Sequence, residues 1–176
     1  MFQGGALFDS MTVGENVDFG MKRLTNYDRD KRKSMVNKYL EMVGLSGTGD
    51  LLPESLSIGM RRRVALARAI ATQPRYIFYD EPTTGLDPIT TDVICDLFLE
   101  LQEKLKVTSI IVTHDLKTAY KVSSRIGLLY AGKIVALDET ARFINSDSPY
   151  VRQFIKGSRE GPMKARDEGK KNESAG

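Results

Sequence analysis

The sequence predicts an α/β fold with a mostly parallel sheet. Two short apolar runs rich in β-forming residues, 76–79 and 109–112, flank an apolar stretch at helical spacing between 89 and 105. The order strand, helix, strand is typical of a parallel sheet, because the helix returns the chain to the end where the first strand began. With 176 residues, 41% of them hydrophobic, the chain is long enough for about one such domain.

The first part of the chain predicts two helices. Residues 34–43 carry apolar side chains at helical spacing, and Gly44 follows as a C-terminal cap. The preceding charge-rich stretch, 22–33, has no such period and indicates a loop. Ser57 is placed to cap a second helix that continues to Ile70.

The remaining elements follow from their patterns in sequence order. We expect a strand at 76–79, a helix at 89–105, a strand at 109–112, a short helix at 116–120, a hairpin formed by 125–130 and 133–137, and a helix at 150–155. The first and second strands are short apolar runs, which indicates that they are buried. From Gly157 the sequence has almost no apolar residues, so we expect a flexible tail.

Composition excludes several classes of protein. The 26 Lys and Arg against 23 Asp and Glu give a net charge of +3, too balanced to indicate nucleic-acid binding. A single cysteine, Cys95, cannot form an internal disulfide and is most simply a packing residue. No stretch approaches the ~20 apolar residues that cross a bilayer, and the N-terminus lacks the pattern of a secretory signal. The expected location is the cytoplasm.

Polar residues follow two of the predicted strands. Asp80 and Glu81 end the first strand, and His114, the only histidine, follows the second. Ligands of open parallel sheets bind beyond these carboxyl ends. There Asp80 could hold Mg²⁺ through oxygen, and Glu81 could orient or deprotonate a water. Taken alone, two acids at a strand end more often cap a loop.

The start of the second helix is a candidate phosphate site. Residues 56–62 read LSIGMRR, and the unpaired N–H groups at a helix N-terminus favour anions. An ordinary capped helix explains this segment equally well. Neither reading by itself accounts for the ordered set of five motifs along the chain: Phe2-Gln3, LSIGMRRRVALARAI, IFYDEP, GLDP and IVTHD.

With these five motifs in order, the chain resembles the ATPase subunits of ABC transporters from Met1 to about Pro162. Within that family the segments FQGGALFDSMTV and DEPTTGLDPIT, and the late VRQFIKG, are most similar to the Mla-type branch, which powers Mce-protein phospholipid transport. The resemblance implies the C-terminal two-thirds of a P-loop NTPase (RecA-like) domain. It divides the chain into a Q-loop and helical signature subdomain (1–75), a catalytic core (76–156) and a tail (157–176).

The resemblance also implies ATP and Mg²⁺ as cofactors and assigns roles by motif position. The implied catalytic residues are Glu81 as general base and His114 at the γ-phosphate; the nucleotide-binding residues are Gln3, Ser57, Gly59 and Asp87; the metal-binding residues are Asp80 and Gln3. Two copies would sandwich ATP between the P-loop of one and the signature helix of the other.

Two features depart from the family pattern. The 176 residues contain no true G-x-x-x-x-G-K-[ST] loop, since the glycines of 44–49 precede Asp50 and those of 127–132 belong to the hairpin. We therefore expect a fragment that is inactive by itself. Ile58 stands where the signature usually has glycine, and its bulk and disfavoured positive φ predict slower turnover.

The resemblance implies a homodimer on the cytoplasmic face of the inner or plasma membrane. Its partners would be an integral membrane permease, docked between Gln3 and Leu56, and an Mce-type lipid-binding protein. Nucleic acid is not expected as a partner, because Arg61, Arg62 and Arg63 would lie on different faces of a helix. Such a run is more typical of a solvated or phosphate-facing helix start. The alternatives are a soluble ABC ATPase without a permease and a non-catalytic module that only binds a partner.

Overall fold

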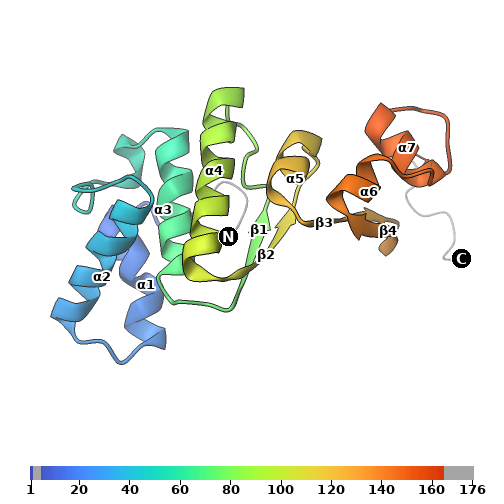
Figure 1. Cartoon of the computed structure of the whole chain (residues 1–176). Coiled ribbons are helices and arrows are strands. Elements are labelled where there is room, and N and C mark those ends of the chain that lie inside the picture. Colours follow the sequence, from blue (N-terminus) through green and yellow to red (C-terminus); the bar gives the residue numbers. More distant parts are fainter. Residues whose placement is uncertain (2–4, 165–176) are drawn as a thin grey trace, which may run out of the picture. The chain divides into compact units, whose positions relative to one another are not determined.

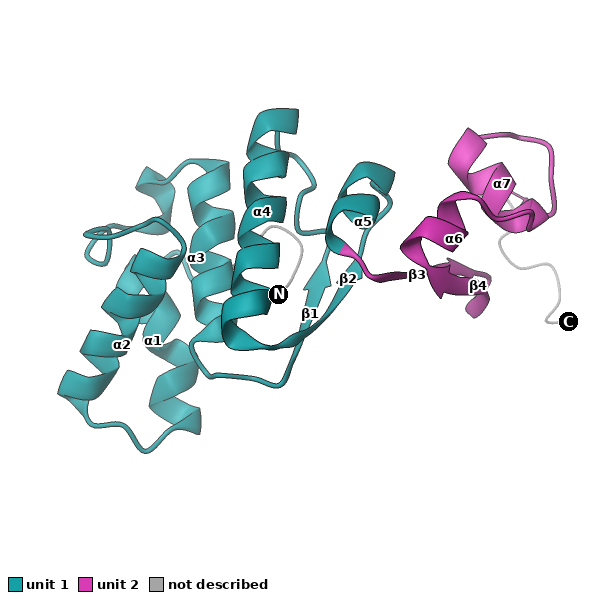
Figure 2. Cartoon of the chain, viewed as in Figure 1, with its two compact units in different colours: residues 1–122 teal, residues 123–176 magenta. Residues whose placement is uncertain are grey.

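The computed structural model describes residue 1 and residues 5–164, which form parts of two compact units, 1–122 and 123–176 (Figure 2). The first unit holds five α-helices, α1 to α5, and the strands β1 and β2; the second holds β3, β4, α6 and α7 (Figure 1). In the described part of the chain, every helix is too short or too polar to cross a membrane.

Helix α1, Val13–Leu24, was not expected from the sequence. Thr12 and Glu15 form a reciprocal capping box, in which each side chain accepts a hydrogen bond from the other residue's backbone N–H. The buried residues of α1 are Val13, Asn16, Val17 and Met21, which share one face. The helix therefore begins at a strong local signal and is held by packing on α2 and α3.

Helix α2, Arg29–Met42, begins five residues before the predicted helix. Asp28 caps it by accepting a hydrogen bond from the Lys31 backbone. The loop predicted for 22–33 is wrong, because only residues 25–28 separate α1 from α2. The first turns of α2 are exposed and charged, so their helical structure leaves no apolar period in the sequence.

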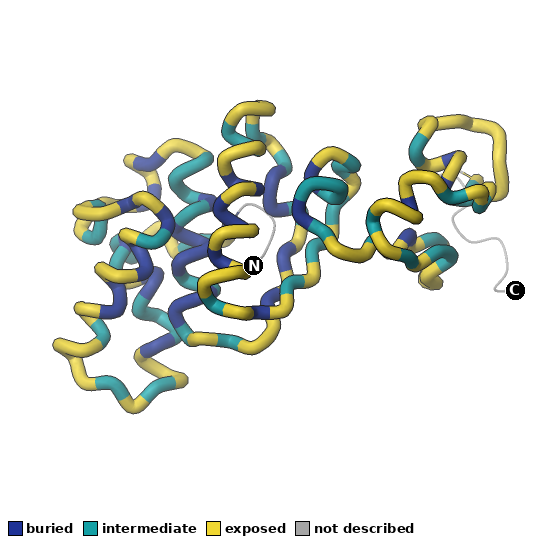
Figure 3. Tube along the Cα trace, in the orientation of Figure 1, coloured by how far each residue is buried: buried dark blue, intermediate teal, exposed yellow. Residues whose placement is uncertain are grey.

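Helix α3, Ile58–Ile70, confirms the predicted helix and its cap at Ser57. A short 3₁₀ turn, Pro53–Ser55, precedes it. Its apolar residues pack between the other helices, and buried residues gather where α1 to α4 face one another (Figure 3). These four helices hold most of the hydrophobic core.

Strands β1, Tyr76–Asp80, and β2, Thr108–Val112, are parallel, with Phe78 opposite Ile110. Helix α4, Pro88–Leu105, connects them, and α5, Leu116–Val122, follows β2. The predicted α/β order and the parallel pairing are confirmed.

The burial predicted for the two strands is only half right. One face packs toward α4, where the rings of Tyr79 and Phe98 lie 4.8 Å apart. The residues of the other face are exposed in the described structure: Tyr76, Phe78, Ile110 and Val112. The backbone of Met1 lies along β1, donating to Phe78 O and accepting from Asp80 N.

The second unit confirms the predicted hairpin. Strands β3, Arg125–Tyr130, and β4, Lys133–Glu139, are antiparallel, and the turn residues Ala131 and Gly132 both have positive φ. Helix α6, Thr140–Ile144, was not expected, whereas α7, Pro149–Lys156, matches the predicted last helix.

The described start of the predicted tail folds back on α7. Gln153 is buried, and its amide group donates to Ser158 O and Met163 O and accepts from Met163 N. The Lys164 backbone donates to the hydroxyl of Tyr130. The segment up to residue 164 is therefore tied to unit 2 by specific hydrogen bonds.

Candidate functional site

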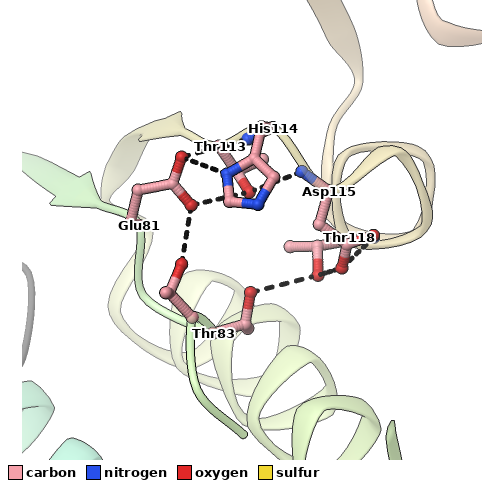
Figure 4. A network of polar contacts seen from close by, with 7 residues as sticks. Glu81, Thr83, Thr113, His114, Asp115 and Thr118 are labelled. Carbon is pink, nitrogen blue, oxygen red and sulfur yellow. Dashed lines mark hydrogen bonds and ion pairs between the residues drawn. The ribbon is translucent and has the colours of Figure 1, made fainter. Parts of the chain in front are cut away.

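The loops that follow β1 and β2 bring Glu81 and His114 together (Figure 4). Nδ1 of His114 lies 2.8 Å from Oε1 of Glu81, and the His114 backbone N–H donates to the same oxygen at 3.1 Å. The contact follows from the parallel pairing, because it places the carboxyl ends of both strands at one edge.

Two threonines hold the other oxygen of the Glu81 carboxylate. Thr84 donates to Oε2 at 2.9 Å, and Thr113 at 3.5 Å. Glu81 itself has a φ of 44°, a left-handed conformation that non-glycine residues seldom adopt and that clusters at functional sites. The carboxylate is thus fixed from both strand-end loops.

The electrostatics of the pair favour opposite charges. Burial alone would raise the pKa of Glu81, but hydrogen bonds from His114 and Thr84 outweigh it and lower that pKa. The hydrogen bond to Glu81 raises the pKa of His114, with the carboxylate charge adding to the effect. The Glu81 side chain is 19% exposed and that of His114 is 75% exposed, so His114 is the outward member of the pair.

Asp80 ends β1 next to this pair and is exposed. Within the described residues no three His, Cys, Asp or Glu side chains cluster as a metal site. One exposed carboxylate nevertheless fits Mg²⁺, since this ion commonly takes one or two protein carboxylates and fills its other positions with phosphate and water. Gln3, the other predicted metal ligand, lies outside the described residues.

The remaining predicted site residues gather at the starts of α3 and α4. Ser57 caps α3 by accepting from the Met60 N–H, and Asp87 caps α4 by accepting from the backbone of Ile89 and Thr90. A hydrogen bond from the Thr90 hydroxyl is the main cause that lowers the pKa of Asp87. A Cβ on Gly59 would lie 2.9 Å from Cγ2 of Thr90, so the close approach of these two helix starts requires glycine.

Ile58 opens α3 with a half-exposed side chain. Its φ is not positive, so the predicted backbone penalty is wrong and only its bulk at the exposed helix start remains.

Sequence reasoning missed Thr84 and Arg62. Thr84 follows the Asp-Glu-Pro motif by two residues, a spacing from which no contact with Glu81 could be recognised. Arg62 was expected on a solvated or phosphate-facing helix start, but it is only 5% exposed. Its guanidinium Nη2 donates to Thr84 O at 2.8 Å.

A second polar network lies beside the Glu81 and His114 pair. Thr118 donates to the Asp115 carboxylate at 2.6 Å and lies 3.4 Å from the hydroxyl of Thr83 (Figure 4). Cys95 is buried, as expected of a packing residue, with Sγ 3.7 Å from Thr118 Oγ1. An adjoining hollow of about 380 Å³ is lined by both strand-end loops, including His114, and by residues of α4 and α5, including Lys117.

Comparisons of the sequence and of the structure with known proteins both find ATP-binding proteins of the ABC transporter type. The family described as ABC transporter matches residues 1–84. The intermembrane phospholipid transport system ATP-binding protein MlaF of Haemophilus influenzae is 39% identical over 164 residues, covering 93% of this chain and 62% of that protein. MlaF of Escherichia coli is 41% identical over 163 residues, covering 93% and 61%.

A solved structure is similar as well. It is a dimeric post-hydrolysis state of the ATP-binding cassette MJ0796 bound to ADP and Pi, with a TM-score of 0.68 and 32% identity over 79% of this chain and 61% of that one. The chain thus spans about three-fifths of the length of the MlaF proteins it matches.

Proposed function

Because the chain belongs to the family of ABC transporter ATP-binding subunits, we propose that it acts in a subunit that hydrolyses ATP to energise transport of phospholipid or another lipid between membranes. The 176 residues contain no G-x-x-x-x-G-K-[ST] loop, so we expect them to be inactive by themselves. The observation that carries this proposal is the Glu81 and His114 pair, held at 2.8 Å where two parallel strands end. The 39% identity to a protein named for intermembrane phospholipid transport supports the lipid as cargo.

The proposed chemistry assigns separate tasks to three residues. Asp80 would hold Mg²⁺, which when bound supplies positive charge to the phosphates. Glu81 would orient the attacking water and accept its proton. His114, mostly exposed, would turn to the γ-phosphate and stabilise charge there.

The pKa of Glu81 bears directly on this division of tasks. A general base works best with a pKa near the operating pH, whereas the bond from His114 keeps the pKa of Glu81 low. When His114 leaves Glu81 for the phosphate, Glu81 loses a hydrogen-bond donor and a positive neighbour. Loss of this donor removes one cause of the low pKa of Glu81, so phosphate binding by His114 would favour proton acceptance by Glu81.

A second copy of the chain would complete the ATP site. Ser57 and Gly59 would contact the ATP held mainly by the other copy, with Asp87 at the interface between copies. Gln3 would bind near the metal and report nucleotide to the coupling surface. The division into a signature subdomain at 1–75, a catalytic core at 76–156 and a tail at 157–176 belongs to the same proposal.

The proposed assembly also includes an integral membrane permease and an Mce-type lipid-binding protein, which would place the chain peripherally at the cytoplasmic face of a membrane. The helical surface between Gln3 and Leu56 is the proposed docking surface for the permease. Genes for a permease and an Mce protein beside this gene would support this reading over a soluble ABC ATPase.

The test is ATP binding and phosphate release by the 176-residue chain and by versions extended by any in-frame codons upstream of Met1. In whichever form is active, Glu81→Gln should reduce turnover by about 10²-fold or more while ATP still binds. Glu103→Gln, an exposed glutamate on α4, is the matched control and should keep turnover. If no form binds ATP, the non-catalytic module replaces this proposal.

A further inference from the structure

Arg62 is a buried charge with few partners. Its side chain lies on α3 with 5% exposure, and its one hydrogen bond is the 2.8 Å contact from Nη2 to Thr84 O. Among the described residues, Nε and Nη1 of Arg62 are buried without a hydrogen-bond partner. Since burying a poorly paired guanidinium is costly, stability alone would favour an apolar side chain at this position.

The contact that Arg62 does make leads to Glu81. Thr84 accepts from Arg62 through its carbonyl and donates through its hydroxyl to Oε2 of Glu81 at 2.9 Å. Two hydrogen bonds of ordinary length therefore join α3 to the carboxylate. The loop that carries Thr84 cannot shift without changing one of them.

The same helix begins at the signature residues. Ser57 caps α3 and Gly59 lies in its first turn, while Arg62 follows in the second. Because a helix moves nearly as a rigid body, a displacement of its start is carried to the guanidinium and from there to the Thr84 carbonyl.

We propose that Arg62 is a positioning residue that couples the start of α3 to Glu81 through Thr84. This inference rests on the proposed function: Ser57 and Gly59 would sense ATP held by the other copy, and Glu81 would act on ATP in its own. Arg62 thereby lets occupancy of one ATP site adjust the carboxylate of the other.

The single histidine allows a test that needs no nucleotide. His114 is the only histidine of the 176 residues, so the ring ¹⁵N signals of the protein need no residue assignment. At a fixed pH, the chemical shifts of these signals report the contact between His114 and Glu81. The difference in the His114 ring ¹⁵N shifts between wild type and Glu81→Ala gives the effect of losing the contact completely. Arg62→Met and Thr84→Val should both move the shifts from the wild-type value toward the Glu81→Ala value.

Two control variants separate this coupling from general damage. Thr84→Ser keeps the hydroxyl and should therefore have the same His114 ring ¹⁵N shifts as the wild type. Arg61→Met removes the neighbouring guanidinium, which donates to Leu56 O instead of Thr84, and should leave the shifts unchanged. Wild-type shifts in Arg62→Met overturn the proposal. If Arg62→Met does not fold, wild-type shifts in Thr84→Val overturn it.

A kinetic measurement completes the test in a form that hydrolyses ATP. Arg62→Met should lower kcat about tenfold with little change in KM, because the carboxylate is misplaced while the ATP contacts remain. An unchanged kcat contradicts the coupling. Failure of every form to hydrolyse ATP would instead count against the proposed function, and the ring shifts would still decide whether Arg62 positions Glu81.

Discussion

His114 Nδ1 lies 2.8 Å from Glu81 Oε1, although the two residues are 33 positions apart in the chain. The contact is made by the ends of two adjacent parallel strands, and each residue changes the other's proton affinity in the direction that favours the ion pair. The first prediction tests this relationship directly.

The stability of the chain should depend on pH through this pair. The folded-state pKa of His114 is raised, so its contribution is present below its unfolded pKa and is lost as the pH rises through the folded value. The folded-state pKa of Glu81 is lowered, so its contribution is present above its unfolded pKa and is lost as the pH falls through the folded value. Denaturant unfolding should therefore give the largest difference in the free energy of unfolding between wild type and His114→Ala at pH values above the Glu81 transition and below the His114 transition. The difference should become smaller at lower and at higher pH. A pH-independent difference would refute the ion pair.

Replacing Gly59 should disturb the contact between the starts of α3 and α4. A Cβ there would lie 2.9 Å from Cγ2 of Thr90, so Gly59→Ala should lower the free energy of unfolding by about 1–3 kcal/mol. Thr90→Ser removes that methyl and keeps the hydroxyl that donates to Asp87. In thermal or denaturant unfolding, the double variant Gly59→Ala/Thr90→Ser should regain most of the free energy of unfolding that Gly59→Ala loses. If the losses of the two single variants add instead, the clash is not the cause.

Substitution of Asn16 should lower the free energy of unfolding more than substitution of most other polar residues. It is fully buried, and its side chain accepts from Phe8 N and donates to the carbonyls of Phe8, Met11 and Thr12. Asn16→Leu removes the side-chain partner of Phe8 N and Met11 O, whereas the carbonyls of Phe8 and Thr12 still accept from the backbone N–H groups of Met11 and Asn16. The variant should cost about 3 kcal/mol in the free energy of unfolding. Asn37→Leu, at an exposed position of α2, is the control. Equal effects of the two variants would contradict the role given to Asn16.

Ile58 offers a gain-of-function test in a form that hydrolyses ATP. Its half-exposed side chain stands at the helix start proposed to face the phosphates of the other copy's ATP. Ile58→Gly removes this bulk and should raise turnover several-fold, roughly in line with one recovered phosphate contact. Phosphate release measured at saturating ATP checks the effect. An unchanged rate means that the bulk of Ile58 does not limit hydrolysis.

Most of the fold could be predicted where burial leaves a clear period in the sequence. Helices α3 and α4 and the hairpin of unit 2 have such periods, and the structure has them close to the expected bounds. Helix α1 was missed although Thr12 and Glu15 have capping-box spacing, since Gly14 and Gly20 lower its intrinsic propensity. The start of α2 was missed because exposed charged turns have no apolar period.

The candidate site was predictable as residue types and not as contacts. Strand-end position identified Glu81 and His114, but their ion pair depends on the loop conformations, including the left-handed φ of Glu81. The contribution of Thr84 could not be recognised, since it acts through a carbonyl and a hydroxyl that any loop threonine carries. The burial of Arg62 was missed for a related reason: a run of three arginines gives no sign of which one the helix turns inward.

One face of β1 and β2 is exposed in the described part of the chain, which has a practical consequence for work with this protein. The exposed residues Tyr76, Phe78, Ile110 and Val112 form an apolar surface of β-forming residues on this face. Such a surface attracts apolar dyes and other copies of itself. The purified chain should therefore bind 8-anilinonaphthalene-1-sulfonate while natively folded, and its apparent mass in solution should increase with concentration.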